Sequence, residues 1–417
     1  MDGIVILAGA RTPFCEYQSG KRGDGQPGGR FADMSAIDLA AVASKEAMAR
    51  AGVDPGAIDH AVFGNAMQTS GDALYGARHV ALKAGLPVRV PALTVNRICG
   101  SGLQSIVTAA QMVRLGEASA VLAGGMENLS QAPHVLRGLR GGLKLGQGKL
   151  EDSLMVALLD TYCGLYMAQT AEKLSARFNT GRDAQDAFAV ESQRRAAAAR
   201  EAGLLAEEIV PVPLPARRGA APVLVEEDDH LKPGTTLEAL AALPPAFSKE
   251  GTVTAGNASG IVDGAAAVVV ASESFALARS AAGASRPVLA TIRGWSTVGV
   301  EPSEMGIGPA PAIRSLLEKA SLPLDAIDLF EINEAFAAQI LPVLADLDLD
   351  RDRVNVHGGA IAIGHPLGAT GTRLALTLAL ELRRRRARYG VASACIGGGQ
   401  GIALLLENPE AARTGRS

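Results

Sequence analysis

The chain has 417 residues, of which 48% are hydrophobic, 20% are charged and only 4% are aromatic. This length allows two or more domain-sized units or one large duplicated fold, and the composition is typical of a soluble globular protein. Scarce aromatic residues and a formal net charge of −3 argue against a nucleic-acid-binding protein, which would need stacking rings and a cationic surface.

No part of the sequence predicts a membrane anchor or a metal site. No apolar run approaches the roughly 18 residues that span a bilayer, and MDGIVILAGARTPF lacks the basic start of a signal peptide. We therefore expect no membrane insertion and a cytoplasmic location. Cys15, Cys99, Cys163 and Cys395 form no CxxC pair, so we expect neither zinc nor, in a cytoplasmic chain, disulfides.

Strand-like and helix-like segments alternate over the first 128 residues, which is typical of an α/β fold with a largely buried sheet. The helix that starts at residue 35 has apolar residues at helical spacing, and Gly52 is placed to cap its end. The expected strands are 3–10, 60–67, 92–95 and 118–128, and the expected helices are 35–52, 77–86 and 102–116.

Residues 128–252 have a different character, with glycine-rich turns, one helical segment at 182–203 and a Pro- and charge-rich stretch at 211–234. This pattern indicates an inserted loop domain rather than another αβ repeat. Regular alternation then returns. The expected elements are a glycine-rich turn and strand at 256–274, strands at 288–295 and 326–333, helices at 311–322 and 334–347, a glycine turn opening into a helix at 358–387, and a hairpin at 391–408.

Cys99, in the stretch VNRICGSGLQ, lies between an apolar strand and a predicted helix. A thiol at a helix start feels the positive end of the helix dipole, which lowers its pKa and favours a nucleophilic thiolate. The small neighbours Gly100, Ser101 and Gly102 would let a substrate carbonyl approach the sulfur. A small buried hydrophobic residue is the alternative, and it is the commoner fate of a cytosolic cysteine.

Three later turns carry residues that suit the same chemistry. His365, in GGAIAIGHPLGATG, is held in a rigid turn before a helix and could take a proton from a thiol. Cys395 precedes the glycines of CIGGGQG, whose backbone N–H groups could face an oxyanion. Asn333, in NEAFA, could position a water or a substrate group. A structural histidine, a tight hairpin and a helix N-cap are the respective alternatives.

Taken together, these segments resemble the thiolases, the acetyl-CoA C-acyltransferases. The matching motifs follow the family's order over essentially the whole chain: ARTPF, VNRICGSGLQ, GGMENLSQAPH, GTVTAGNASG, WSTVGVEPSEMGIGP, NEAFAAQ, GGAIAIGHPLGATGTR and CIGGGQG. The two halves also echo one another, each with a Cys or His at a glycine-rich turn before a helix, which suggests a duplication.

The resemblance implies a role for each of these residues. Cys99 matches the nucleophile that becomes acylated, and His365 matches the histidine that activates it and contributes to a first oxyanion hole. Asn333 matches the residue that holds a water in that hole. Cys395 matches the second thiol, which carries the proton to and from the substrate. The N–H groups of Cys99 and Gly397 match a second oxyanion hole.

The resemblance also implies the substrates. Thiolases cleave a 3-oxoacyl-CoA into acetyl-CoA and a shortened acyl-CoA, or condense two acetyl-CoA, and the acetyl-CoA C-acetyltransferases are the subtype we expect here. Ser259 matches a contact to the pantetheine arm, Met167 a substrate contact, and Met305 and Phe336 positions in the acyl pocket. CoA and acyl-CoA are therefore the expected partners, with no metal and no permanently bound cofactor.

The implied architecture is a duplicated α/β thiolase fold with five layers, α-β-α-β-α, and an inserted loop domain. We expect one half at 1–127 plus 253–283, the loop domain at 128–252, and the second half at 284–417. The segment from GGMENLSQAPH to RGGLKLG resembles the loop through which tetrameric members associate, so we expect a homotetramer.

Three departures from the acetoacetyl-CoA thiolase pattern qualify the expected specificity: Tyr166 stands where a histidine is usual, His357 where an asparagine is usual, and Gln400 where a methionine is usual. His357 could add polarity near the site or merely fill a loop. The rival readings are a ketoacyl synthase, which the second cysteine in CIGGGQG disfavours, and a non-catalytic acyl-CoA carrier, which the intact set of Cys99, Asn333, His365 and Cys395 disfavours.

Overall fold

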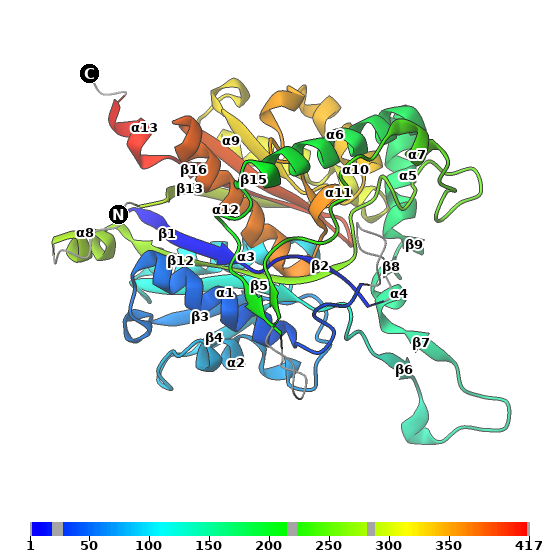
Figure 1. Ribbon diagram of the computed structural model, residues 1–417, viewed down its shortest axis with the longest axis horizontal. Helices are drawn as coiled ribbons and strands as arrows, with labels where there is room; N and C mark the ends of the chain where they lie inside the picture. The colour runs from blue at the N-terminus through cyan, green and yellow to red at the C-terminus, as the bar shows by residue number, and fades with distance from the viewer. Residues whose placement is uncertain (1, 19–27, 215–222, 282–287, 415–417) are drawn as a thin grey trace.

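A computed structural model describes residues 2–18, 28–214, 223–281 and 288–414 of the chain (Figure 1). Regular elements appear close to where the sequence predicts them. In the first half, the strands are β1 (Ile4–Arg11), β2 (Cys15–Glu16), β3 (His60–Gly64), β4 (Ala92–Val95), β5 (Ala120–Glu127) and β12 (Val262–Ser272), and the helices are α1 (Ala36–Ala51), α2 (Gly76–Lys83) and α3 (Ser101–Leu115).

The ends of α1 show how local sequence sets these boundaries. The Ser35 hydroxyl accepts a hydrogen bond from the backbone N–H of Asp38 and caps the helix start. Gly52 has φ of 63° and ends the helix in the left-handed conformation, as the sequence predicts.

The second half contains one further sheet segment and its helices. Its strands are β13 (Ala290–Gly299), β14 (Leu329–Ile332), β15 (Tyr389–Ile396) and β16 (Gln400–Glu407), and its helices are α9 (Pro309–Ala320), α10 (Ala337–Leu347), α11 (Ala360–Ile363), α12 (Leu367–Arg385) and α13 (Pro409–Thr414); α8 (Glu273–Ala281) precedes them. β15 and β16 form the predicted hairpin, and Gly398 and Gly399 in its turn have φ of 83° and 86°, which favours glycine.

All ten strands of the two halves are hydrogen-bonded in one mixed sheet. The order is β14-β15-β16-β13-β1-β12-β5-β3-β4, with β2 beside β12. The halves meet where Val5 pairs with Thr291 and Ile6 with Ala290. Because this junction is short, each half keeps its own faces for helices to cover.

Helices α3 and α12 pack against each other and form the middle layer between the two parts of the sheet (Figure 1). Helix α1 covers β1 and β12 on one outer face, and α9 covers β13 and β16 on the other. The result is the predicted five-layered α-β-α-β-α arrangement. Glycines permit the central contact, because a Cβ on Gly102 would lie 2.5 Å from the backbone N of Thr372.

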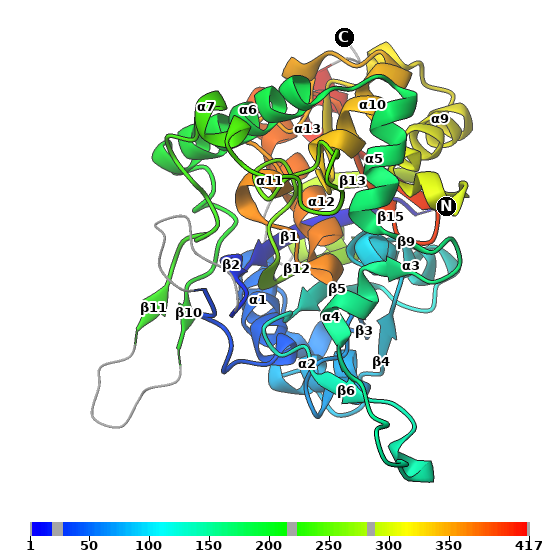
Figure 2. The same cartoon turned by 90° about the vertical axis from the view of Figure 1, so that its right-hand side faces the viewer.

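The segment between β5 and β12 is a set of short elements that cover one side of the molecule. They are β6 (His134–Leu136), β7 (Leu150–Asp152), α4 (Ser153–Ala157), β8 (Leu159–Asp160), β9 (Leu165–Tyr166), α5 (Met167–Arg177), α6 (Arg182–Glu201), β10 (Val212–Pro213), β11 (Leu224–Val225) and α7 (Leu237–Ala241). Helices α5 and α6 pack on α10, while the β6–β7 hairpin extends away from the body (Figure 2).

Most boundaries differ from the sequence prediction by a few residues, and two of the differences have a clear local cause. The helix expected from residue 334 begins at Ala337, because Phe336 is extended and forms a bridge with Ala258. The predicted turn and helix at 358–387 contain two helices, since Gly364 with φ of 92° and Pro366 separate α11 from α12. Within the described residues, no helix is both long and apolar enough to cross a bilayer.

Candidate active site

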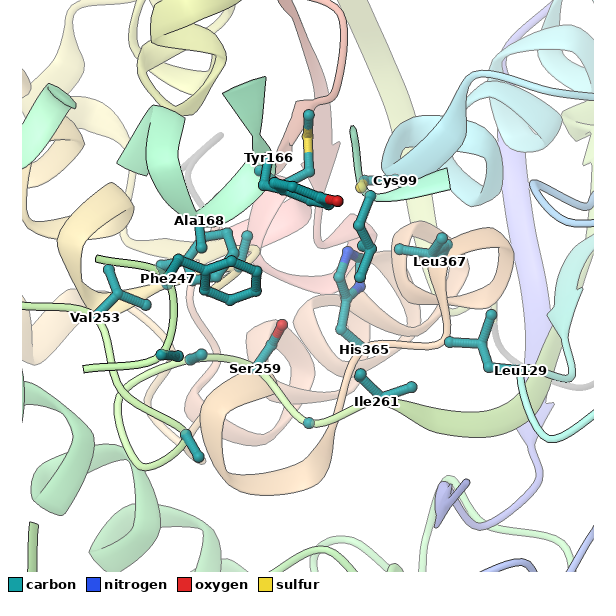
Figure 3. Close-up of a pocket in the computed structure, with 18 of the residues that line it drawn as sticks. Cys99, Leu129, Tyr166, Ala168, Phe247, Val253, Ser259, Ile261, His365 and Leu367 are labelled. Atoms are coloured by element: carbon teal, nitrogen blue, oxygen red, sulfur yellow. The ribbon is translucent and has the colours of Figure 1, made fainter. Parts of the chain in front are cut away.

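One cavity of about 390 Å³ collects seven of the nine candidate residues of the sequence analysis, whereas Asn333 and Gly397 lie outside its wall (Figure 3). It lies between the loops that end the central strands and the covering segment around α4, α5 and β9. The candidate residues that line it are Cys99, His365, Cys395, Ser259, Met167, Met305 and Phe336. The sequence therefore predicted seven residues of this wall from positions spread over almost 300 residues of chain.

Cys99 lies in a single 3-10 turn, Ile98–Gly100, immediately before α3. The hydroxyl of Ser101 braces this turn, since it donates to the carbonyl of Ile98 at 2.7 Å and accepts from the N–H of Arg97 at 2.8 Å. Ile98 has φ of 47°, a left-handed conformation that a β-branched residue rarely adopts. The turn is thus held in a costly backbone geometry that presents the thiol to the cavity.

The predicted lowering of the Cys99 pKa by the helix dipole is wrong. The pKa of the Cys99 thiol is raised to about 12, chiefly because burial disfavours the thiolate, with a smaller contribution in the same direction from the carboxyl of Glu127. The backbone N–H groups of Gly397 and Cys99 act in the opposite direction without overcoming burial. The thiol is therefore neutral near pH 7, and a base must remove its proton during the reaction.

His365 has the tautomer that such a base requires. Thr370 Oγ1 donates to the carbonyl of Pro366 at 3.0 Å, so it accepts a hydrogen bond from the Nδ1–H of His365 at 2.6 Å. The lone pair is then on Nε2, which the Asn333 amide approaches at 3.3 Å. Burial, with a smaller effect of Arg373, lowers the pKa of His365 to about 3, so the imidazole is neutral.

Replacement of Thr370 by valine tests this tautomer assignment. Valine keeps the shape but leaves Nδ1–H without an acceptor, so we expect kcat to fall roughly 10- to 100-fold, with little change in KM. Thr370→Ser keeps the hydroxyl and should retain most of the kcat of the unaltered enzyme. Thr377→Val is the matched control. Thr377 lies on the same helix as Thr370, but its hydroxyl donates to Glu208 at 2.6 Å and not to a residue of the site. Equal kcat values for the Thr370 and Thr377 valine variants would contradict the assignment.

Asn333 lies directly after β14 and is fully buried. Its Oδ1 has no hydrogen-bond partner among the described residues, although a buried amide oxygen normally has one. The neighbouring Glu334 accepts hydrogen bonds from Ser192 at 2.7 Å and from Asn355 at 2.8 Å. Glu334 thus fixes the NEAF turn, while the orphaned Asn333 oxygen is suited to hold a water.

Cys395 and Gly397 come from the β15–β16 hairpin. Cys395 is fully buried with Met305 and Ala335, and its pKa is raised by burial and by the nearby Cys99. A Cβ on Gly397 would lie 3.1 Å from Met167 Sδ, so glycine leaves room for a substrate beside its N–H. Both thiols therefore reach one cavity from opposite halves of the fold.

Glu127 is a fully buried glutamate next to the turn that carries His365, and sequence reasoning missed its part in the site. It accepts hydrogen bonds from the N–H groups of Ala66 (3.1 Å), Met67 (2.9 Å) and Gly368 (2.9 Å). Burial raises its pKa to about 8. Because Gly368 is three residues after His365, Glu127 ties the His365 turn to the first half.

The three departures have different positions in the structure. Tyr166 lines the cavity, and its ring packs on Phe247 with centroids 5.8 Å apart and extends toward Cys99 (Figure 3). His357 does not line the cavity; it pairs with Glu381 at 2.7 Å. Gln400 accepts from Arg97 at 2.7 Å, outside the cavity wall. Of the three, only Tyr166 is placed to affect substrate choice.

Several further residues of the cavity wall were not singled out by the sequence analysis. Cys15 and Cys163 lie outside the wall, as expected of incidental thiols. The residues that sequence analysis did not single out are mostly apolar, with the polar pair Glu16 and His230 among them. These further wall residues include Leu129, Leu154, Leu158, Phe247, Val253, Ile261 and Leu367. In the described part of the chain, no group of three or more His, Cys, Asp or Glu is placed to hold a metal ion.

Comparison with known proteins agrees with this geometry. The N-terminal thiolase domain model matches residues 4–274 and the C-terminal thiolase domain model matches residues 286–408. A human mitochondrial 3-ketoacyl-CoA thiolase is 48% identical over 97% of this chain and 98% of its own. An acetyl-CoA acetyltransferase of Cupriavidus necator is 47% identical over 98% of this chain and 100% of its own.

Solved structures show the same fold. The crystal structure of human mitochondrial 3-ketoacyl-CoA thiolase has a TM-score of 0.91 at 47% identity, covering 98% of this chain and 99% of that one. The acetyl-CoA acetyltransferase of Bacillus anthracis has a TM-score of 0.92 at 41% identity, covering 98% of this chain and 99% of that one. The predicted family is confirmed: the chain belongs to the thiolases.

Proposed function

We propose that this thiolase exchanges acyl groups with CoA through an acyl-enzyme on Cys99. The observation that carries the proposal is the convergence of two thiols and one neutral imidazole in a single cavity. CoA-dependent cleavage of 3-oxoacyl-CoA, or the reverse condensation, is the activity of the family. A similar solved structure is that of human mitochondrial 3-ketoacyl-CoA thiolase in complex with CoA, which supports CoA as the substrate here.

In the first half-reaction, Cys99 Sγ attacks C3 of the 3-oxoacyl-CoA while its proton moves to His365 Nε2. The C2–C3 bond then breaks, and its electron pair remains on C2 of the departing acetyl-CoA. Cys395 donates its proton to C2, which releases acetyl-CoA and leaves the shortened acyl group on Cys99. A water held by Asn333, together with protonated His365, would stabilise the alkoxide that forms at C3.

In the second half-reaction, the CoA thiol attacks the Cys99 thioester and gives its proton to the Cys395 thiolate. The N–H groups of Cys99 and Gly397 stabilise the tetrahedral oxyanion. Collapse of this intermediate releases the shortened acyl-CoA, and His365 returns the proton to Cys99. All protons are thereby restored, and the covalent intermediate implies ping-pong kinetics.

For the substrate, we propose the acetyl-CoA C-acetyltransferase subtype, with acetoacetyl-CoA as a good substrate. Acetyl-CoA acetyltransferases of two bacteria support this subtype at 47% and 46% identity. The ring of Tyr166 extends toward Cys99 and packs on Phe247 behind it, so Tyr166 occupies part of the cavity near the thiol (Figure 3). This part of the wall favours a small acyl group.

A thiolysis assay across 3-oxoacyl-CoAs of increasing length, including one 3-oxo-dicarboxylyl-CoA, tests this proposal. We expect the highest kcat/KM with acetoacetyl-CoA and a decline as the chain lengthens. A maximum at a medium chain length would contradict the subtype but not the family. Failure of every 3-oxoacyl-CoA would contradict the activity itself.

We also propose a cytoplasmic homotetramer of two halves and a loop domain with the predicted boundaries. The β6–β7 hairpin and its connection present four exposed leucines, which suit contact with a second copy: Leu139, Leu143, Leu145 and Leu150. Light scattering of the intact protein measures the assembly state directly.

A further inference from the structure

The cavity wall contains an acid–imidazole pair that the catalytic steps above do not use. Glu16 is 3% exposed and His230 is 8% exposed, and both line the cavity. His230 Nδ1 lies 2.7 Å from Glu16 Oε1, which makes a hydrogen bond in which the imidazole is the donor. Removing two such groups from water costs free energy. Their position in a mostly apolar cavity wall is therefore more easily explained if they bind a polar group of a ligand.

The pair is built into the turn that carries Ser259. Strand β2 places Glu16 opposite Val262, and the N–H of Tyr17 donates to the carbonyl of Ile261 at 3.1 Å. A Cβ on Gly260 would lie 2.4 Å from His230 Nε2, so the ring rests against that glycine. The carbonyl of Gly260 in turn accepts from the N–H of His365 at 2.9 Å.

Both members of the pair have unused hydrogen-bonding capacity. Glu16 Oε2 is buried and has no partner among the residues that the structure describes. Within the same described ranges, His230 Nε2 has none either, and its side chain keeps 11% exposure. A buried oxygen without a partner is uncommon, and Glu16 Oε2 is therefore available to a polar group of a ligand in the cavity.

The position of the pair along the cavity indicates which ligand group this is. Cys99 marks the thioester end, and Lys232 is an exposed cation that also lines the cavity. Leu231, between His230 and Lys232, is buried away from the cavity with Ala196 and Ile363. An anionic phosphate group suits the exposed Lys232, so the pair meets the part of CoA between the phosphates and the sulfur.

That part is the pantetheine arm, an otherwise flexible chain with two amides and one hydroxyl. We propose, on the basis of the proposed function, that His230, oriented by Glu16, hydrogen-bonds the hydroxyl or the amide of the pantetheine arm that lie toward the phosphates, which N-acetylcysteamine lacks. Because Nδ1–H is committed to Glu16, Nε2 is the acceptor for that O–H or N–H group. His230 is thus a substrate-binding residue, and Glu16 is its positioning residue.

Truncated substrates test the assignment. Thiolysis would be measured with acetoacetyl-CoA, acetoacetyl-pantetheine and acetoacetyl-N-acetylcysteamine, each with its matching free thiol; the last lacks most of the arm. We expect His230→Phe to lower kcat/KM roughly tenfold with the first two and to leave the third unchanged. Glu16→Gln should lower kcat/KM less, but with the same two substrates. Lys232→Ala should lower kcat/KM only with acetoacetyl-CoA, because only that substrate carries phosphates.

His79→Phe is the matched control, since His79 also faces a carboxylate, Asp72 at 3.3 Å, but does not line the cavity. It should leave all three rates unchanged. The proposal would be overturned if His230→Phe and Glu16→Gln each lowered kcat/KM by the same factor with all three substrates. Such a result would mean that the pair supports the fold or the chemical steps and does not bind the arm. No loss with acetoacetyl-pantetheine would overturn it too. Inactivity of the unaltered enzyme toward acetoacetyl-CoA would instead overturn the proposed function.

Discussion

Cys99→Ser is expected to abolish the acyl-enzyme and to lower kcat by a factor of about 10³ or more. A serine hydroxyl has nearly the same size, but it is a much weaker acid and nucleophile than a thiol. The transfer of its proton to His365 during attack is therefore harder than the transfer from a thiol. Intact-protein mass spectrometry after mixing with acetoacetyl-CoA should show an added acyl mass in the unaltered enzyme and none in the variant.

Cys163→Ser is the matched control, because Cys163 is a half-buried thiol that does not line the cavity. It should acylate and turn over normally. Peptide mapping should place the acyl group on the peptide that contains Cys99. Undiminished acylation of the Cys99→Ser variant would show that another residue is the nucleophile.

Cys395→Ala is expected to separate acylation from turnover. Cys99 and His365 remain, so an acyl-enzyme should still form, but no thiol is left to protonate C2 of the departing acetyl-CoA or to accept the proton of the incoming CoA. Loss of such a general acid–base group lowers kcat by roughly 10²- to 10⁴-fold. Mixing with acetyl-CoA, whose thiolate can leave without a proton from Cys395, should therefore show acylation of Cys99, whereas steady-state thiolysis of acetoacetyl-CoA should be very slow.

Cys15→Ala controls for the loss of a buried thiol, since Cys15 is fully buried but belongs to β2 and does not line the cavity. Its steady-state rate should be close to normal. A near-normal steady-state rate for Cys395→Ala would exclude Cys395 as the proton carrier and would mean that another group of the cavity carries the proton.

Much of the fold was accessible from the sequence because it depends on local periodicity. The alternating segments and the terminal glycines, such as Gly52 after α1, have direct local signals. The three catalytic turns carried motifs whose residue types and glycines are constrained together. Their assembly into one cavity followed from the family resemblance and not from spacing alone.

The features that sequence reasoning missed depend on contacts between distant residues. The direction of the Cys99 pKa shift was wrong because the dipole of α3 is local, whereas the burial that dominates arises only once the whole chain has folded around the thiol. The pairing of Glu16 with His230 joins residues 214 positions apart. The tautomer of His365 required the orientation of Thr370, which a motif does not record.

The close packing of the two halves also bears on how this enzyme can be altered. A Cβ on Gly125 would lie 1.8 Å from the carbonyl oxygen of Gly368, and a Cβ on Gly371 would lie 2.2 Å from the N of Leu103. Chimeras that exchange one half for that of a relative must therefore conserve both surfaces of this seam. Substitutions that alter substrate range are better placed at Tyr166 and Phe247, because their side chains line the cavity and do not belong to the glycine contacts between the two halves.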